Sequence, residues 1–168
     1  AIVVDGGIDT IIGLNVMSGF WNSAVVATST ANFRFRDNDV AKAARSTIMA
    51  NGIDWAEDSY VVIDGTSING NADFCMDIMG NEFIHEDEAN AAGVYIKDDK
   101  DAIDDFDVCV IKVENNGFKN FLNGYNVEAD LDKTALLRDG NSFINLGGRL
   151  GVYTGANNQY FSLPYSAQ

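Results

Sequence analysis

The sequence predicts an α+β domain dominated by β-structure, in which an antiparallel sheet or sandwich carries one main helix near residues 39–51. Three observations predict this class. The 168 residues include 16 glycines and a single proline, so turns must depend on Gly, Asn and Asp, as in β-rich chains. Apolar and polar residues alternate between residues 25 and 35, which is the period of a strand. Between residues 40 and 49 the apolar residues recur instead at helical spacing.

The N-terminal third predicts strands. The run AIVV (1–4), the turn signal at 5–7 and the apolar run that follows are typical of strand, turn and strand. A helix over 8–31 is the alternative, because some apolar residues there also fall at i, i+4 spacing. Its glycines and β-branched residues disfavour that alternative.

The main helix is predicted from its two ends and its buried stripe. Residues 37–39, Asp-Asn-Asp, supply an N-cap, and Asn-Gly at 51–52 supplies a C-cap. Val40, Ala44 and Ile48 lie on one face between them. We therefore expect this helix to pack on a sheet.

The rest of the chain predicts further strands and two short helices. We expect a hairpin formed by 59–65 and 73–79, and additional strands at 93–96, 108–113, 142–155 and 159–166. Short helices are expected near 84–92 and 131–138. We detect no internal repeat and no linker, so we predict one domain over 1–168, with 1–33 a candidate assembly arm or strand segment.

The formal net charge is −14. A polyanionic surface repels phosphate backbones and anionic lipid head groups, which argues against nucleic-acid and membrane-surface binding. Residues 10–33 contain no ionisable side chain, but their Asn, Gly, Ser and Thr content makes a membrane span a poor interpretation. We expect this stretch to be buried in the molecule or against a partner.

Two residue groups suggest chemistry beyond folding. Cys75 and Cys109 each lie in an apolar run. The sequence is consistent with two interpretations, a disulfide between them or two buried free thiols. The acidic run that follows residue 97 predicts a solvated loop. The alternative is a Ca²⁺ site, because carboxylates in a flexible loop are ligands that Ca²⁺ prefers. The candidate ligands are Asp98, Asp99, Asp101, Asp104 and Asp105.

No catalytic constellation is evident. His85 is the single histidine, and it lies among carboxylates, which weakens any nucleophile–histidine or metal proposal. Glu82 precedes it at a spacing used by carboxylate-bridged metal sites, but such sites require further ligands on facing helices. An enzyme is therefore the third choice of function, and we predict no catalytic residue and no cofactor other than the Ca²⁺ alternative.

The uncharged ends carry the functional prediction. Residues 10–33 and 150–168 both lack charged side chains and are rich in β-forming residues. Such segments can add to a sheet of a neighbouring molecule. We therefore predict a structural subunit of an extracellular or virion-type filament, tube or shell, whose partners are copies of itself. The expected assembly contacts are Ile11, Ile12, Phe20, Trp21, Tyr160, Phe161 and Tyr165. The alternative is a secreted adhesion module that binds carbohydrate or protein, with or without Ca²⁺.

Overall fold

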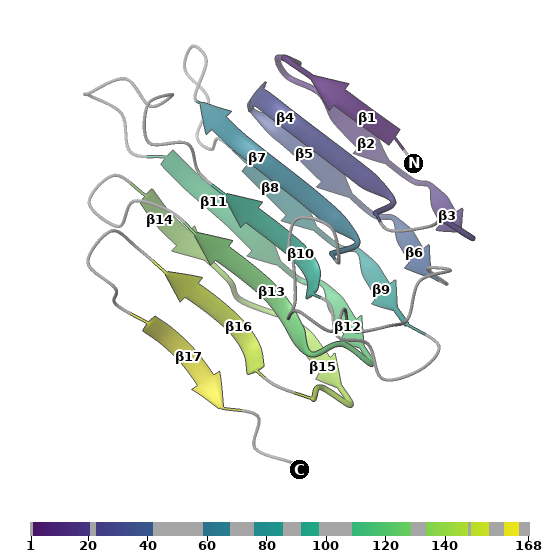
Figure 1. The fold of residues 1–168 in the computed structure, drawn as a ribbon, viewed down its shortest axis with the longest axis vertical. Helices are drawn as coiled ribbons and strands as arrows, with labels where there is room; N and C mark the ends of the chain where they lie inside the picture. Colours follow the sequence, from purple (N-terminus) through teal and green to yellow (C-terminus); the bar gives the residue numbers. More distant parts are fainter. Residues whose placement is uncertain are drawn as a thin grey trace, which may run out of the picture.

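The structure is a computed structural model of the 168-residue chain. It describes residues 2–20, 23–41, 59–67, 76–85, 92–97, 109–128, 134–147, 149–154 and 160–164. Within these ranges every regular element is a β-strand, and the strands form three sheets (Figure 1). We call them sheets A, B and C.

Neighbouring strands in a sheet are three apart in chain order, except for the last pair of sheet A. Sheet A contains β1 (Ile2–Asp5), β4 (Val25–Ala31), β7 (Val61–Ser67), β10 (Ala92–Lys97), β13 (Asn123–Glu128), β16 (Arg149–Thr154) and β17 (Tyr160–Pro164). Sheet B contains β2 (Ile11–Gly13), β5 (Phe33–Arg36), β8 (Met76–Met79), β11 (Cys109–Glu114) and β14 (Thr134–Leu137). Sheet C contains β3 (Val16–Ser18), β6 (Asp39–Ala41), β9 (Glu82–Ile84), β12 (Gly117–Lys119) and β15 (Ser142–Ile144).

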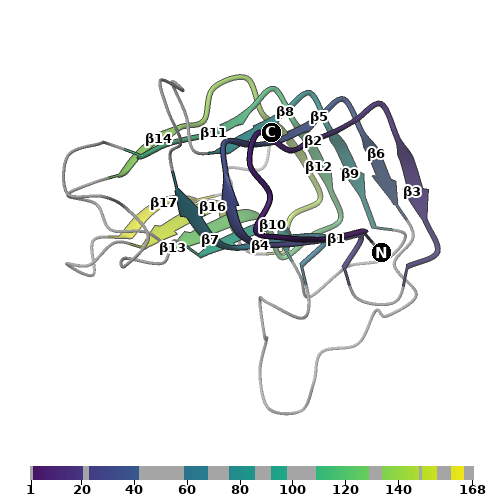
Figure 2. The same ribbon diagram turned by 90° about the horizontal axis from the view of Figure 1, so that it is seen from above.

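The chain visits the sheets in the fixed order A, B, C and then begins again. Each turn adds one strand to every sheet, and the new strand pairs in parallel with the strand of the preceding turn. Five such coils enclose a common interior, as the view from above shows (Figure 2). The last strand, β17, is different because it turns back and pairs antiparallel with β16. This architecture is a parallel β-helix, in which each coil contacts its neighbours along one axis.

The predicted fold class is wrong in its sheet type and in its main helix. From β1 to β16, strands that follow one another along the chain lie in different sheets, so β7 and β8 do not form the expected hairpin. Residues 39–41 of the predicted main helix form strand β6, and its remainder lies outside the described residues. The predicted short helices overlap β9 and β14 in the same way. The β-rich character is confirmed.

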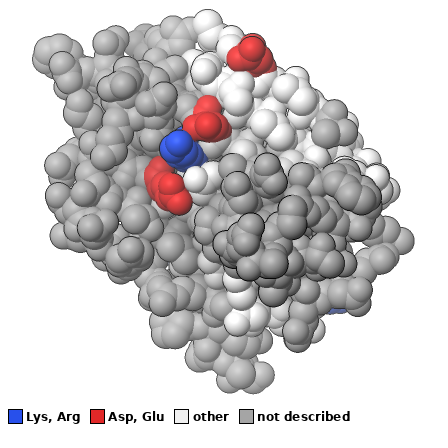
Figure 3. Space-filling view, viewed as in Figure 1, with Lys and Arg blue, Asp and Glu red and all other residues white. Residues whose placement is uncertain are grey.

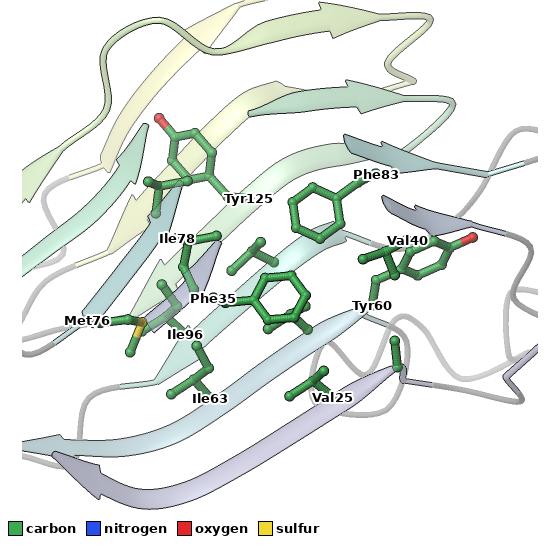
Figure 4. Close-up of a cluster of buried hydrophobic side chains, with 14 of the residues drawn as sticks. Val25, Phe35, Val40, Tyr60, Ile63, Met76, Ile78, Phe83, Ile96 and Tyr125 are labelled. Atoms are coloured by element: carbon green, nitrogen blue, oxygen red, sulfur yellow. The ribbon is translucent and has the colours of Figure 1, made fainter. Parts of the chain in front are cut away.

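The interior is filled by side chains that repeat from coil to coil. In sheet A, Val25, Val61, Val94 and Tyr125 occupy one row across four neighbouring strands, and all are buried. Parallel strands lie about 4.8 Å apart, so side chains in one row pack directly on each other. Several members of this core are drawn in Figure 4.

Aromatic rings form the densest part of the core. In sheet C, Phe83 stacks on Phe118 with 5.1 Å between ring centroids, and Phe118 stacks on Phe143 at 5.5 Å. A second group surrounds Tyr60, whose ring makes edge contacts with Phe20 and Phe121 at 4.8 and 4.9 Å. His85 is buried beside this second group, so it is part of the core packing.

An asparagine ladder fixes the corner between sheets B and C. One asparagine per coil occupies this corner, and consecutive amides are hydrogen-bonded to each other over 2.9–3.2 Å. The ladder consists of Asn15, Asn38, Asn81, Asn116 and Asn141. The residue before each of them has a positive φ, between 55° and 72°. The residue two places after each asparagine lies in a strand of sheet C and faces the interior of the β-helix, as Val40 and Phe83 do.

Candidate assembly surface

The first coil, residues 2–20, is the terminal coil at one end of the described β-helix. Its strands β1, β2 and β3 are each the terminal strand of a sheet, because each pairs on one side only. All three edges therefore belong to the same coil and lie at the same level along the axis (Figure 1). Edge strands present unpaired N–H and C=O groups that another strand can bind.

Among the side chains that the structure describes, the same coil carries most of the exposed apolar ones. Nine large hydrophobic residues are exposed among the described residues, and six of them belong to the first coil. The six are Ile2, Val3, Ile8, Ile11, Leu14 and Val16. The largest exposed fractions are 86% for Leu14 and 80% for Val16. Single exposed apolar residues are ordinary on protein surfaces, whereas these six are concentrated in one coil and lie around its three sides.

The opposite end of the molecule is built differently. Sheet A continues through β16 and β17, whereas sheets B and C end at β14 and β15. The pairing of β16 with β17 is irregular between Arg149 and Val152, and β17 contains Pro164, the single proline of the chain. Bulges and proline are devices that keep edge strands from pairing with other molecules. By contrast, the strands of the first coil contain neither proline nor a basic residue.

The predicted assembly residues fall into three groups. Ile11 is on the surface of the first coil, with 59% of the residue exposed. Ile12 and Phe20 are buried in the core of the same coil. Tyr160 and Phe161 lie in β17, where only the backbone is described, and Trp21 and Tyr165 are outside the described residues.

The other five exposed apolar residues of the first coil are absent from the predicted contacts. The sequence holds a signal for Val16, because strand residues alternate between the two faces of a sheet. In Ile11-Ile12 and in Val16-Met17 two apolar residues are adjacent, so one of each pair must face outward. The same reasoning separates exposed Ile11 from buried Ile12.

The two chemical predictions lie largely outside the described residues. The candidate calcium ligands Asp98, Asp99, Asp101, Asp104 and Asp105 are all in the undescribed segment that joins β10 to β11. Cys109 begins β11, but its side chain is not described, and neither is Cys75. Within the part of the chain that the structure describes, no group of three or more His, Cys, Asp or Glu side chains is arranged to hold a metal ion.

Charged residues cross the outer side of sheet A in one row. Asp5, Asp64, Lys97 and Glu128 are exposed, and their strand register aligns them across β1, β7, β10 and β13, with Thr28 of β4 between the first two. Figure 3 shows acidic groups and one basic group in a line on this side of the molecule. The Thr28 hydroxyl donates to Asp5 at 3.1 Å, and the single Lys lies between two carboxylates along the row. Alternation of charge is a stabilising cross-strand arrangement.

Sheet B carries a second set of charges around one buried acid. Asp77 has no exposed side-chain surface, and Arg36 of the preceding coil forms an ion pair with it. Arg34 and Lys112 are its register partners on the two neighbouring strands. Basic residues thus flank the carboxylate from both sides along the sheet, which offsets the cost of burying its charge.

No family model, curated protein sequence or solved structure matches the chain. Over the described ranges, no helix has the length and apolar character needed to cross a membrane. Function must therefore be inferred from the surfaces of the molecule itself.

Proposed function

We propose that the protein is a structural subunit that self-associates through its first coil, as part of an extracellular or virion-type assembly. The observation that supports this proposal is the coincidence of two features at one end of the β-helix. Three unpaired sheet edges are found there, together with six of the nine exposed large apolar residues of the described chain.

The apolar surface of this end is large enough to support a stable contact. The exposed fractions of the six residues correspond to about four fully exposed aliphatic side chains, whose burial contributes about 6–12 kcal/mol from each copy. Association costs about 4–15 kcal/mol in lost translational and rotational freedom. Complete burial in two copies would contribute about 12–24 kcal/mol, which is of the same order as this cost, and hydrogen bonds between the edges would add to it.

The remaining alternatives rest on residues that the structure does not describe. A Ca²⁺-dependent adhesion module depends on the acidic run at 98–105, which lies outside the described ranges. Carbohydrate binding and carboxylate catalysis have no further observation in their favour. They stay predictions from the sequence.

A matched pair of lysine substitutions tests the proposal. Ile11 and Leu137 occupy the same row of sheet B at its two opposite edges, with exposed fractions of 59% and 44%. Lysine on an edge strand opposes pairing with a second molecule. We expect Ile11→Lys to weaken self-association at least about 30-fold, since each copy loses apolar burial and gains a charge to desolvate.

Sedimentation equilibrium of the wild type and both variants provides the measurement. Leu137→Lys changes the net charge by the same amount and should leave association unchanged. Circular dichroism spectra of the three proteins should coincide, because both side chains are on the surface. A wild type that is monomeric at the highest soluble concentration contradicts the proposal, as does equal weakening by the two variants.

A further inference from the structure

We infer that the contact at the first coil is a head-to-head one, in which the first coils of two copies meet about a two-fold axis, so that this contact joins two copies and no more. This inference rests on the proposed function and specifies its partner. It follows from the geometry of the two ends of the β-helix.

The partner of the first coil must itself present three strand edges. The edges of β1, β2 and β3 surround the interior on three sides at one level. A single added strand would cover one of them and leave the other two open. Only another coil of similar cross-section can pair with all three at once.

The opposite end of a second copy does not meet this requirement. Its sheet A extends two strands, β16 and β17, beyond the coil that ends sheets B and C. Strands in a sheet are spaced by about 4.8 Å, so this end is stepped by roughly 10 Å. A head-to-tail contact through β17 would hold β14 and β15 away from β2 and β3.

The first coil of a second copy does present three strand edges at one level. A two-fold axis perpendicular to the helix axis brings two level ends together and makes the paired edges antiparallel. The chain already uses antiparallel pairing at its other end, between β16 and β17. Such an interface uses the same surface on both copies, so it closes at two molecules.

The charge of the first coil is also compatible with self-pairing. Asp5 and Asp9 are the ionisable side chains of residues 2–20. With no basic residue in the coil, an oppositely charged partner has few carboxylates to recognise. The coil itself sets only these two carboxylates against those of the second copy, in addition to the general repulsion between two chains of net charge −14. Salt screens this repulsion, so we expect the dimer to tighten as the salt concentration is raised.

Site-specific photo-crosslinking tests the arrangement. A benzoylphenylalanine at Val16, in β3, should crosslink to the first coil of a partner copy in the intact protein. The matched control is the same replacement at Ile144 in β15, at the opposite edge of sheet C, where 53% of the residue is exposed. Mixing ¹⁵N-labelled and unlabelled copies identifies crosslinks between molecules by mass spectrometry.

The outcomes separate this inference from the proposed function. A dimer that crosslinks from Val16 to the partner's residues 2–20, with no intermolecular product from Ile144, supports it. An open series of oligomers, or products that join Val16 to strands β14–β17, overturns the head-to-head geometry and leaves self-association intact. A monomer overturns both.

Discussion

Replacement of Asn81 by alanine should destabilise the fold more than the equivalent change at the end of the asparagine ladder. The Asn81 side chain is fully buried. Its Nδ2 donates to the Phe35 carbonyl at 2.8 Å and to Asn116 Oδ1 at 2.9 Å, and its Oδ1 accepts from the backbone N–H of Asn38 at 2.9 Å. Removal of the amide therefore deprives buried groups in both neighbouring coils of a partner.

The magnitude follows from those groups. A buried donor or acceptor left without a partner costs about 1–3 kcal/mol, and the Asn38 N–H and the Phe35 carbonyl both lose one. We expect a loss of about 3–5 kcal/mol in the free energy of unfolding for Asn81→Ala. Asn15 is exposed in the first coil, so water can replace its bonds, and Asn15→Ala should cost about 0.5–1.5 kcal/mol.

Urea unfolding followed by far-ultraviolet circular dichroism measures both values. The proteins should be compared at one concentration, because self-association would add to the apparent stability of each. Asn81→Asp is a useful third variant, because it keeps the shape of the side chain but removes the donors. Costs for Asn81→Ala and Asn15→Ala within about 1 kcal/mol of each other would refute a structural role for the ladder.

Two further variants test the core. Phe118→Ala removes the central ring of the stack between Phe83 and Phe143 and should cost about 3–5 kcal/mol in urea unfolding. Phe118→Leu keeps much of the apolar volume and should cost clearly less, and a cost close to zero for this variant would show that ring stacking contributes nothing beyond apolar burial. Burial raises the pKa of Tyr125 above its ordinary value of 10.0, while a hydrogen bond from Arg138 and its charge act in the opposite direction. Because the folded state holds the phenolic proton more tightly, this stabilisation is complete below pH 10 and is lost as the pH rises through the folded pKa. Melting temperatures measured above pH 10 should fall less steeply for Tyr125→Phe, and parallel curves would contradict the assignment.

The strands were largely predictable, and their arrangement was not. Alternation correctly identified the strand regions at 25–35, and apolar runs identified those at 61–67, 76–79 and 109–114. Turn signals such as Asp5-Gly6-Gly7 occur both in hairpins and at the corners of a β-helix. In a β-helix a corner leads the chain to a different sheet, whereas a hairpin turn leads it back to the same sheet. The turn signals therefore gave the wrong prediction that consecutive strands pair with each other.

The incorrectly predicted main helix shows why a strand of only three residues is difficult to recognise from sequence. Asp39–Ala41 form β6, and the cap signal at 37–39 belongs in fact to the ladder corner, with Asp37 at φ 55° and Asn38 in the ladder. Asn and Asp are favoured at helix N-caps and in left-handed corners for the same reason, namely that their short polar side chains bond to nearby backbone. Local sequence could not separate the two uses.

The repeat escaped detection because its length varies. Consecutive ladder asparagines are separated by 23, 43, 35 and 25 residues. Between the ladder and the preceding strand of sheet B the chain is short in every coil, so the additional residues enter at the other two corners. The constant feature of the coil is thus a short local pattern: a left-handed residue, the asparagine, and an interior residue two places later.

Such variation in length requires a local device that restores the register in every coil. A shift of one residue in a strand would turn its apolar side chains outward. The three inner ladder asparagines, Asn38, Asn81 and Asn116, prevent this shift, because each bonds to the backbone of the preceding coil and to the amide of the next, as Asn81 does with Phe35 and Asn116. The register of sheets B and C is therefore set at this corner, whatever the length of the segments elsewhere. The first coil is held to the second by Asn38, whose Nδ2 donates to the Ile12 carbonyl and whose Oδ1 accepts from Asn15. Its three edges are therefore held in place before any partner binds, so little ordering cost remains when two first coils associate.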